Sequence, residues 1–331
     1  MERFALAAAV VLGFALTAAL CSLFVPLRRV LERREQNQQP AQSEQPRPAP
    51  LRAPLWGGLC AAAGTVAAVG VGWLAACVGQ PELLGSEGRL MTRLLTALAG
   101  SLAFGAVGFA EDLARMRSPA ALGLRRDVRL LLEALAAAFV LLLLQAAGCL
   151  PRGLDVPGAG YVLLGSAVPF LWAVLMVVLA ECARIAERDE GTVCGAAFVA
   201  MLALMMAEAG LGVPGLAVLP AALAGALVAL GLWAFPPARL GAGCCGSLLA
   251  AGAIGCIPLS LDMTSLTVPL ALPFWAAGGL LAAQLLGAKR TGKPLRCWVK
   301  KHKMSPETVF LCSFALSAVG YVLALALLRW C

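Results

Sequence analysis

Apolar residues in this chain gather into blocks of about twenty positions, and the shorter segments between the blocks hold most of the charged residues. A helix of about 20 residues crosses the hydrocarbon core of a bilayer, and only helices or closed barrels satisfy their backbone groups there. The blocks are rich in Ala and Leu and show no strict alternation, which favours helices. We predict ten membrane-spanning helices, at residues 4–25, 55–78, 92–110, 128–148, 161–180, 193–208, 213–233, 245–260, 265–287 and 307–328.

The composition agrees with a protein built almost entirely of such helices. Hydrophobic residues make up 61% of the 331 residues and charged residues 13%, whereas soluble domains carry about 25% charged residues. We therefore expect one all-α integral membrane unit over residues 1–331. Residues 32–50 are the exception, because they are polar, rich in Pro and without large apolar side chains. This composition predicts a flexible cytoplasmic loop.

The net charge of +8 is unevenly distributed along the chain. Most Lys and Arg residues lie in every second segment between the predicted spans, at residues 28–52, 115–129, 184–188, 239 and 289–303. Such an excess marks loops on the cytoplasmic side of a membrane. The pattern predicts an even number of spans, with both termini outside. Anionic lipid headgroups account for the basic charge, so we expect no nucleic-acid partner.

Two features in the first half of the chain combine glycines or carboxylates with a cytoplasmic helix end. Gly57 and Gly58 follow Pro54, and this pattern is typical of a membrane helix that a neighbour approaches closely. Glu111 and Asp112 are adjacent at the end of an apolar block. Paired carboxylates can hold Mg²⁺ or accept a proton. Acidic residues oppose the dipole at a helix C-terminus, which favours a functional role over a solvated helix end.

A third feature is a run of charged residues that recur every three positions. Glu181, Arg184, Glu187 and Glu190 can share one face of a helix, and Gly191 follows them. Residues three apart on a helix form ion pairs at its surface. The pattern is equally consistent with a salt-bridged surface helix and with a binding site.

Two further features lie in the second half of the chain. Residues 243–248 read Gly-Cys-Cys-Gly-Ser-Leu; glycines there let a ligand approach the backbone, but no other Cys or His lies at the spacing of a zinc site. Arg296, Cys297 and Trp298 lie within the basic run at 289–303. That run either sets the topology or binds phosphate.

In their order, spacing and shared cytoplasmic side, these five features resemble the motifs of the phospho-N-acetylmuramoyl-pentapeptide transferases, a family of polyprenyl-phosphate phosphosugar transferases. Residues 52–58 (RAPLWGG), 108–112 (GFAED), 181–191, 237–248 and 294–306 carry the resemblance. It implies a ten-span enzyme of the bacterial inner membrane that uses Mg²⁺ to move a phospho-sugar from a UDP-linked precursor to undecaprenyl phosphate. It also suggests a homodimer or a partner membrane protein.

The resemblance implies a role for each residue at a matched position. Glu111 and Asp112 are the expected catalytic carboxylates, and Asp112 is also a candidate metal ligand. Apart from the resemblance, the guanidinium groups of Arg115, Arg125, Arg126 and Arg129 can bind a lipid phosphate. The expected nucleotide-sugar ligands are Glu181, Arg184, Glu187, Glu190 and Gly191. The other matched positions are Pro54, Gly57, Gly58, Ala234, Cys244, Gly246, Ser247, Arg296, Cys297 and Trp298.

The chain departs from the family's pattern at most of its polar positions. Glu replaces Asp at 111, 187 and 190; Glu181 and Arg184 replace two Asn residues; Ala234 replaces an Asn, and Cys244 replaces the metal-binding Asp. Arg296, Cys297 and Trp298 replace three His residues, and the single His302 lies outside that triplet. A soft thiol is a poor ligand for Mg²⁺, and a misplacement of about 1 Å can cost about a hundredfold in rate.

Three hypotheses follow from these departures. The first is a divergent member of the family without ordinary transferase activity, which binds a lipid phosphate or a membrane partner. The second is an active transferase with an altered site for a UDP-sugar, supported by Gly108, Asp112, Gly246 and Ser247. The third is a transporter, which no chain of charges in the middle of the predicted spans supports; Glu133 and Glu208 lie near span ends. The first hypothesis is favoured.

Overall fold

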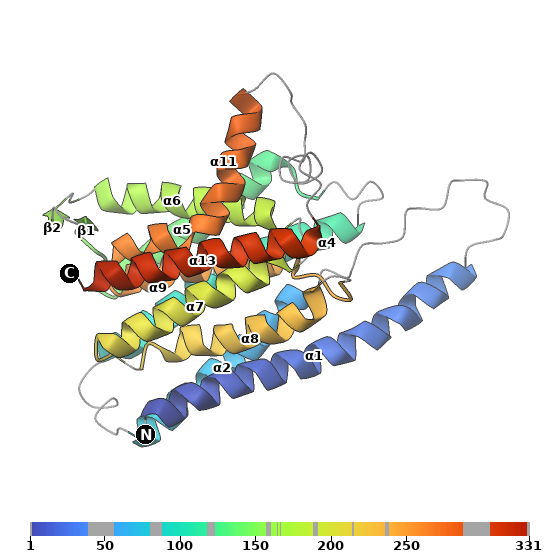
Figure 1. The fold of residues 1–331 in the computed structure, drawn as a ribbon, viewed down its shortest axis with the longest axis horizontal. Helices are drawn as coiled ribbons and strands as arrows, with labels where there is room; N and C mark the ends of the chain where they lie inside the picture. The colour runs from blue at the N-terminus through green and yellow to red at the C-terminus, as the bar shows by residue number, and fades with distance from the viewer. Residues whose placement is uncertain are drawn as a thin grey trace.

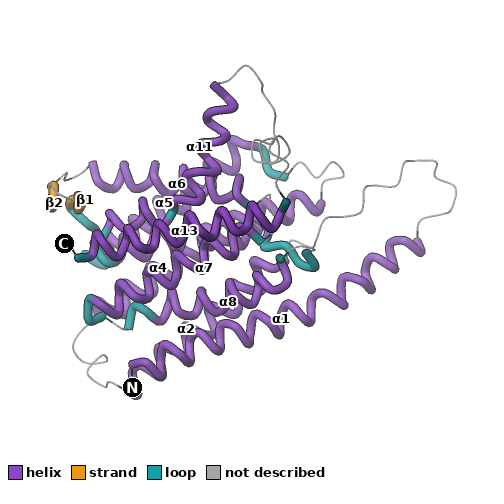
Figure 2. Tube along the Cα trace, viewed as in Figure 1, coloured by secondary structure: helices purple, strands orange, loops and turns teal. Residues whose placement is uncertain are grey.

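The computed structural model describes residues 2–38, 56–79, 88–117, 123–156, 160–163, 165, 167–187, 191–213, 215–235, 238–286 and 305–329. These residues form a bundle of helices with one small β-hairpin at its edge (Figures 1 and 2). The long helices are α1 (Glu2–Gln38), α2 (Gly57–Gly79), α4 (Gly88–Arg117), α5 (Arg126–Ala146), α6 (Ala167–Ala186), α7 (Thr192–Gly210), α8 (Val218–Ala234), α9 (Gly243–Ser260), α11 (Leu272–Leu286) and α13 (Pro306–Leu328).

Shorter elements connect some of these helices. The strands β1 (Gly153–Val156) and β2 (Gly160–Leu163) pair antiparallel between α5 and α6, with Gly153 opposite Leu163. A 3₁₀ turn, η1 (Thr264–Leu266), and the single-turn helix α10 (Thr267–Leu270) precede α11. Helices therefore make up nearly all of the described chain, as the sequence predicts.

Seven of the described helices are long and apolar enough to cross a membrane: α1, α2, α4, α6, α7, α9 and α13. Helix α8 is apolar but shorter, with 17 residues. Each of the ten predicted spans overlaps one of the long helices, although α5, α8 and α11 do not belong to the seven. The chain is thus a multi-pass membrane protein, and the count of ten spans with both termini outside stays a prediction.

Three predicted segments differ from the observed elements. Residues 161–163 belong to strand β2, and α6 begins only at Ala167. The predicted span 265–287 is divided into η1, α10 and α11, because Pro269 and Pro273 cannot donate the backbone hydrogen bonds of one continuous helix. Helix α1 continues to Gln38, so residues 32–38 are helical rather than part of a loop. The Glu, Arg and Gln residues there favour helix, and no proline lies between Pro26 and Pro40.

Helix α9 lies at the centre of the bundle, and every one of its residues is buried. It packs most extensively against α4, and α2, α6 and α7 also contact it. A helix that is apolar on all sides is expected in such a position. The core of the protein is therefore the α4–α9 pair with its neighbours around it.

Glycines let the backbones of the central helices approach one another. A Cβ atom added at Gly108 of α4 would collide with the backbone of Cys244 in α9, and one added at Gly58 of α2 would collide with the backbone nitrogen of Gly246. Between α1 and α8, Gly13 meets the carbonyl of Ala222 in the same way. Small residues at such positions are typical of helix packing in membranes, where close van der Waals contact replaces the hydrophobic effect.

We predict that Gly58→Ala destabilises the protein, whereas Gly70→Ala in the same helix does not. The new methyl group at Gly58 would displace the start of α9 at a cost of about 1–3 kcal/mol. A Cβ at Gly70 meets nothing within 4 Å, and Ala is the better helix former by up to about 1 kcal/mol. Thermal unfolding in lipid nanodiscs, followed by tryptophan fluorescence, measures both changes. Equal melting temperatures for the two variants would contradict this prediction.

Candidate functional site

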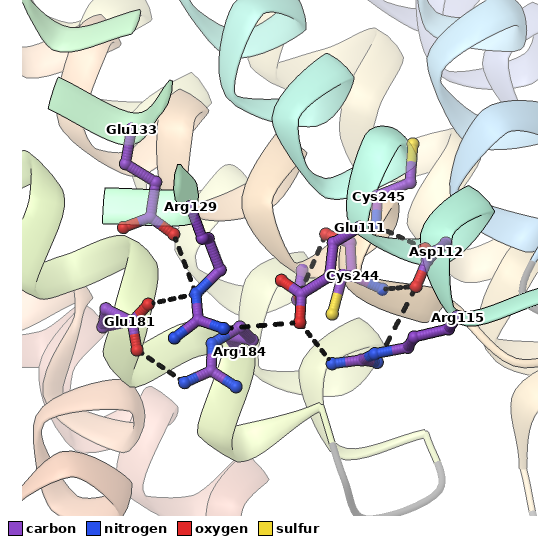
Figure 3. Close-up of polar contacts among 10 residues, drawn as sticks. Glu111, Asp112, Arg115, Arg129, Glu133, Glu181, Arg184, Cys244 and Cys245 are labelled. Carbon is purple, nitrogen blue, oxygen red and sulfur yellow. Dashed lines mark hydrogen bonds and ion pairs between the residues drawn. The ribbon is translucent and has the colours of Figure 1, made fainter. Parts of the chain in front are cut away.

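The ends of four helices meet at one side of the bundle and bring most of the predicted site residues together. They are the C-terminal ends of α4 and α6 and the N-terminal ends of α5 and α9, as Figure 3 shows. Hydrogen bonds and ion pairs join the charged side chains of this region. We call the following residues the charged cluster: Glu111, Asp112, Arg115, Arg129, Glu133, Glu181 and Arg184.

Asp112 caps the first turn of α9. Its Oδ1 accepts a hydrogen bond from the backbone N–H of Cys244 at 3.0 Å, and its Oδ2 accepts one from Cys245 at 2.9 Å. The N-cap position of α9 is Ala242, whose side chain makes no capping bond. The first N–H groups of a helix lack partners within the helix, and its N-terminus attracts negative charge. The buried Asp112 carboxylate satisfies both requirements from a different helix.

Glu111 lies between two arginines. Arg115, one turn further along α4, donates from Nη2 to Glu111 Oε1 at 2.6 Å. The Nη1 atom of Arg129 in α5 lies 3.7 Å from the same oxygen. The other carboxylate oxygen of Glu111 is buried without a hydrogen-bond partner. The two adjacent carboxylates therefore have different roles in the structure, one in an ion pair and one in a helix cap.

Glu181 links α6 to α5. Its Oε1 accepts a hydrogen bond from Nε of Arg129 at 2.6 Å, and its Oε2 accepts one from Nη2 of Arg184 at 2.5 Å. Glu133, one turn beyond Arg129 in α5, is fully buried, and its nearest charged partner is Arg129 Nε at 4.0 Å. Charge-assisted bonds as short as those of Glu181 are among the stronger polar contacts in proteins.

Glu187 follows the last residue of α6 and lies beside Asp112 and Arg115. Burial raises the pKa of Glu187 from its ordinary value of 4.5 to about 8, and the negative charge of Asp112 raises it further. Arg115 and a backbone hydrogen bond with Gly243 act in the opposite direction. A carboxyl group with a pKa near neutral can hold or release a proton under physiological conditions.

The other predicted positions fall into three groups. Gly57, Gly58, Gly246 and Ser247 lie where α2 meets α9, and Ser247 Oγ donates to the carbonyl of Cys244 at 3.1 Å. Gly191 has a φ of +74° and lies against the backbone of the buried Ala234. Arg125 and Arg126 are exposed at the start of α5, outside the charged cluster. The candidates outside the described residues are Pro54, Glu190, Arg296, Cys297 and Trp298.

Two parts of the site are not among the site residues predicted from the sequence. Glu133 lies near a span end in the sequence, and its spacing of four residues from Arg129 on one helix is the signal for the ion pair that the structure shows. The other part is the backbone N–H groups of Cys244 and Cys245. Every residue except proline has such a group, so the sequence does not show that these two bind Asp112. The two cysteine thiols are buried, so the contribution of this segment to the site is its backbone.

The donors in this region do not fit a magnesium ion. Mg²⁺ requires near-octahedral oxygen coordination, but both oxygens of Asp112 accept backbone N–H groups and Glu111 is paired with Arg115. The buried side chain at position 244 is a thiol, which is too soft for this ion. Among the described residues, no three His, Cys, Asp or Glu side chains group so that they can hold a metal ion.

Comparison with known proteins assigns this polytopic bundle to a family of glycosyl transferases. A family model described as glycosyl transferase family 4 matches residues 94–262, about half of the chain and including the whole charged cluster. The chain belongs to glycosyl transferase family 4.

The chain is also similar to two phospho-N-acetylmuramoyl-pentapeptide-transferases. The one from Mycobacterium tuberculosis (strain ATCC 25618 / H37Rv) is 28% identical over 265 residues, which cover 72% of each chain. The one from Desulforudis audaxviator (strain MP104C) is 34% identical over 170 residues, or 48% of this chain and 50% of the relative. These relatives confirm the predicted resemblance.

We predict that Asp112→Ala lowers the melting temperature more than Asp112→Asn does. Alanine leaves two buried N–H groups without acceptors, at about 1–3 kcal/mol each, whereas asparagine retains one acceptor oxygen. Asp127→Ala, which removes an exposed carboxylate in the first turn of α5, is the control and is expected to have a small effect. A melting temperature of Asp112→Ala equal to that of the control would show that the cap contributes little.

We predict that Glu187 makes the protein less stable as the pH rises from about 4.5 to about 8. In this interval the folded state keeps a proton that the unfolded state has lost, so the free energy of unfolding falls with pH. Glu187→Gln removes this proton. The difference between the melting temperatures at pH 5 and pH 8 is therefore expected to be smaller in the variant than in the wild type. An identical difference in both proteins would contradict the shifted pKa.

Proposed function

We propose that this chain is a divergent member of its family that has lost ordinary magnesium-dependent phosphosugar transfer and binds the phosphate of a polyprenyl carrier lipid. The relatives are phospho-N-acetylmuramoyl-pentapeptide-transferases. We place the present chain at the same lipid-intermediate stage of bacterial cell-wall synthesis, in a regulatory role. The expected ligands are undecaprenyl phosphate and, at lower affinity, a UDP-sugar.

One observation carries this proposal: three carboxylates of the site, those of Asp112, Glu111 and Glu181, are already bound within the protein. Asp112 is bound to the start of α9, and Glu111 and Glu181 are bound to arginines. A catalytic metal centre needs carboxylate oxygens that point at the ion. The site instead presents guanidinium groups, which suit phosphate recognition.

The position of the arginines supports a lipid ligand in particular. Arg125 and Arg126 are exposed at the start of α5, and Arg115 at the end of α4 is partly exposed. These helix ends lie at the edge of a bundle whose long helices are apolar enough to cross a membrane. A phosphate on a carrier lipid is held at this depth, where the apolar core ends. The excess of Lys and Arg in alternate loops supports a site that faces the cytoplasm of a bacterial inner membrane.

The second candidate is an active transferase with an altered site, and Glu187 is the observation that favours it. A general base works best with a pKa near the operating pH, and the pKa of Glu187 is raised to about 8 next to the retained Asp112. In this version Glu187 would accept a proton from the attacking lipid phosphate or a bound water. The donor would be a UDP-sugar. Any Mg²⁺ requirement would then have to be met by ligands beyond the charged cluster.

A transfer assay separates the two candidates. The purified protein in nanodiscs receives undecaprenyl phosphate, UDP-linked muramoyl pentapeptide and Mg²⁺, and the release of UMP is measured. The M. tuberculosis relative serves as the positive control and the heat-inactivated protein as the blank. We expect no UMP release above the blank. UMP release that Glu187→Gln or Asp112→Asn abolishes would establish the active enzyme and overturn the proposal.

A binding assay tests the lipid ligand directly. We predict that the wild type binds undecaprenyl phosphate and that the double variant Arg125→Gln, Arg126→Gln binds it about a hundredfold more weakly or worse, because each of the two lost charge-assisted contacts contributes about 1.5–3 kcal/mol. Arg152→Gln is the matched control, since Arg152 is exposed near the β-hairpin, between α5 and α6 on the side away from the site. Equal affinities in the double variant and the control would contradict a role of these arginines.

A further inference from the structure

Two buried guanidinium groups and one carboxylate form the tightest part of the charged cluster. Arg129 from α5 and Arg184 from α6 each bind one oxygen of Glu181, at 2.6 and 2.5 Å. The two arginine side chains are 9% and 10% exposed, whereas the Glu181 side chain is 23% exposed. The two guanidinium groups are therefore more deeply buried than the carboxylate between them, and Figure 3 shows both arginines joined to Glu181.

The arginines have donor capacity that the carboxylate does not use. Nε of Arg184 is buried without a hydrogen-bond partner. Nη1 of Arg129 lies 3.7 Å from Glu111 Oε1, beyond hydrogen-bond distance. An unpaired buried donor costs free energy, and a carboxylate with two oxygens cannot reach every donor of two guanidinium groups. A phosphate monoester offers three oxygens and a charge of about −1.5 to −2.

We propose that Glu181 is an internal substitute for a phosphate ligand. Its carboxylate occupies the anion site formed by Arg129 and Arg184, and a phosphate monoester dianion enters by displacing it, without a divalent cation. This inference rests on the proposed function, because it specifies how the site binds the phosphate. Glu181 then sets the affinity, since any ligand must compete with a carboxylate that is always present.

The displacement is compatible with the surroundings of Glu181. The residue lies in the last two turns of α6, and its side chain is exposed enough for the carboxylate to rotate into water with its charge solvated. The two arginines have less freedom, because Arg129 also lies near Glu111 and Glu133 and both guanidinium groups are buried. The exchange thus moves one flexible side chain and leaves the anion site in place.

The test measures the binding of undecaprenyl phosphate in nanodiscs by wild type and Glu181→Gln, with EDTA and with Mg²⁺. Gln has nearly the same shape but no charge, so we expect affinity to rise about tenfold in both conditions, and Arg184→Gln to lose binding. Glu307→Gln is the control, because Glu307 is an exposed carboxylate at the start of α13, where the basic run places the cytoplasmic side. Parallel titrations with UMP and inorganic phosphate distinguish a lipid-linked phosphate from a nucleotide or free phosphate.

Each result decides between clear alternatives. Unchanged or weaker binding by a folded Glu181→Gln, or binding that EDTA abolishes, overturns the inference. If Glu181→Gln does not fold, Glu181→Asp replaces it, and its shorter side chain is expected to tighten binding to a smaller extent; no tightening again overturns the inference. Another outcome is that the wild type binds undecaprenyl phosphate through Arg125 and Arg126 while substitutions at Glu181 leave its affinity unchanged. That result overturns the inference about Glu181 and supports the proposed function. Failure of every variant to bind any phosphate ligand overturns both.

Discussion

The bond between the Asp112 carboxylate and the first peptide N–H groups of α9 is the interaction on which the rest of this bundle depends. Helix α9 is buried on all sides and has no side chain of its own to cap its first turn, and a membrane interior does not provide water for that purpose. Asp112 supplies the two acceptors, and the glycine at position 108, one turn earlier, lets the α4 backbone lie against Cys244. The cap also determines where the other site residues lie, because Glu111 and Arg115 follow Asp112 on the same helix.

A contribution to stability alone does not account for the charged cluster. Removing several charges from water costs several kcal/mol for each ion, and buried ion pairs often only compensate for that cost. Arginines from α4, α5 and α6 nevertheless converge on carboxylates within hydrogen-bond distance. Such an arrangement is expected where the groups bind something, because a preorganised set of guanidinium groups can exchange one anion for another with little reorganisation. The cluster therefore connects the family's scaffold with a chemistry based on arginine rather than on a metal ion.

Much of the scaffold could be predicted from the sequence, because the thickness of a bilayer imposes a length on each apolar segment. The break before α11 was missed although Pro269 and Pro273 mark it, and the four-residue strands of the hairpin are too short to be distinguished from the start of α6. In the site, Glu181 and Arg184 were expected to share a face, and they do. The pairing of Arg129 with Glu181 depends on how α5 packs against α6, and the partners of Asp112 are backbone groups. Neither relationship can be derived from the spacing of residues in one sequence.

Helix α9 is enclosed by protein, and its cap comes from a residue 132 positions earlier in the chain. During synthesis α4 therefore enters the membrane long before the helix that it must cap. The site cannot form from local contacts, and its assembly requires a pairing of high sequence separation, which slows folding. Until α9 packs against α4, the hydrogen bonds between the Asp112 carboxylate and the first N–H groups of α9 cannot form. The pairing of α9 with α4 thus gives Asp112, one member of the charged cluster, its two hydrogen-bond partners.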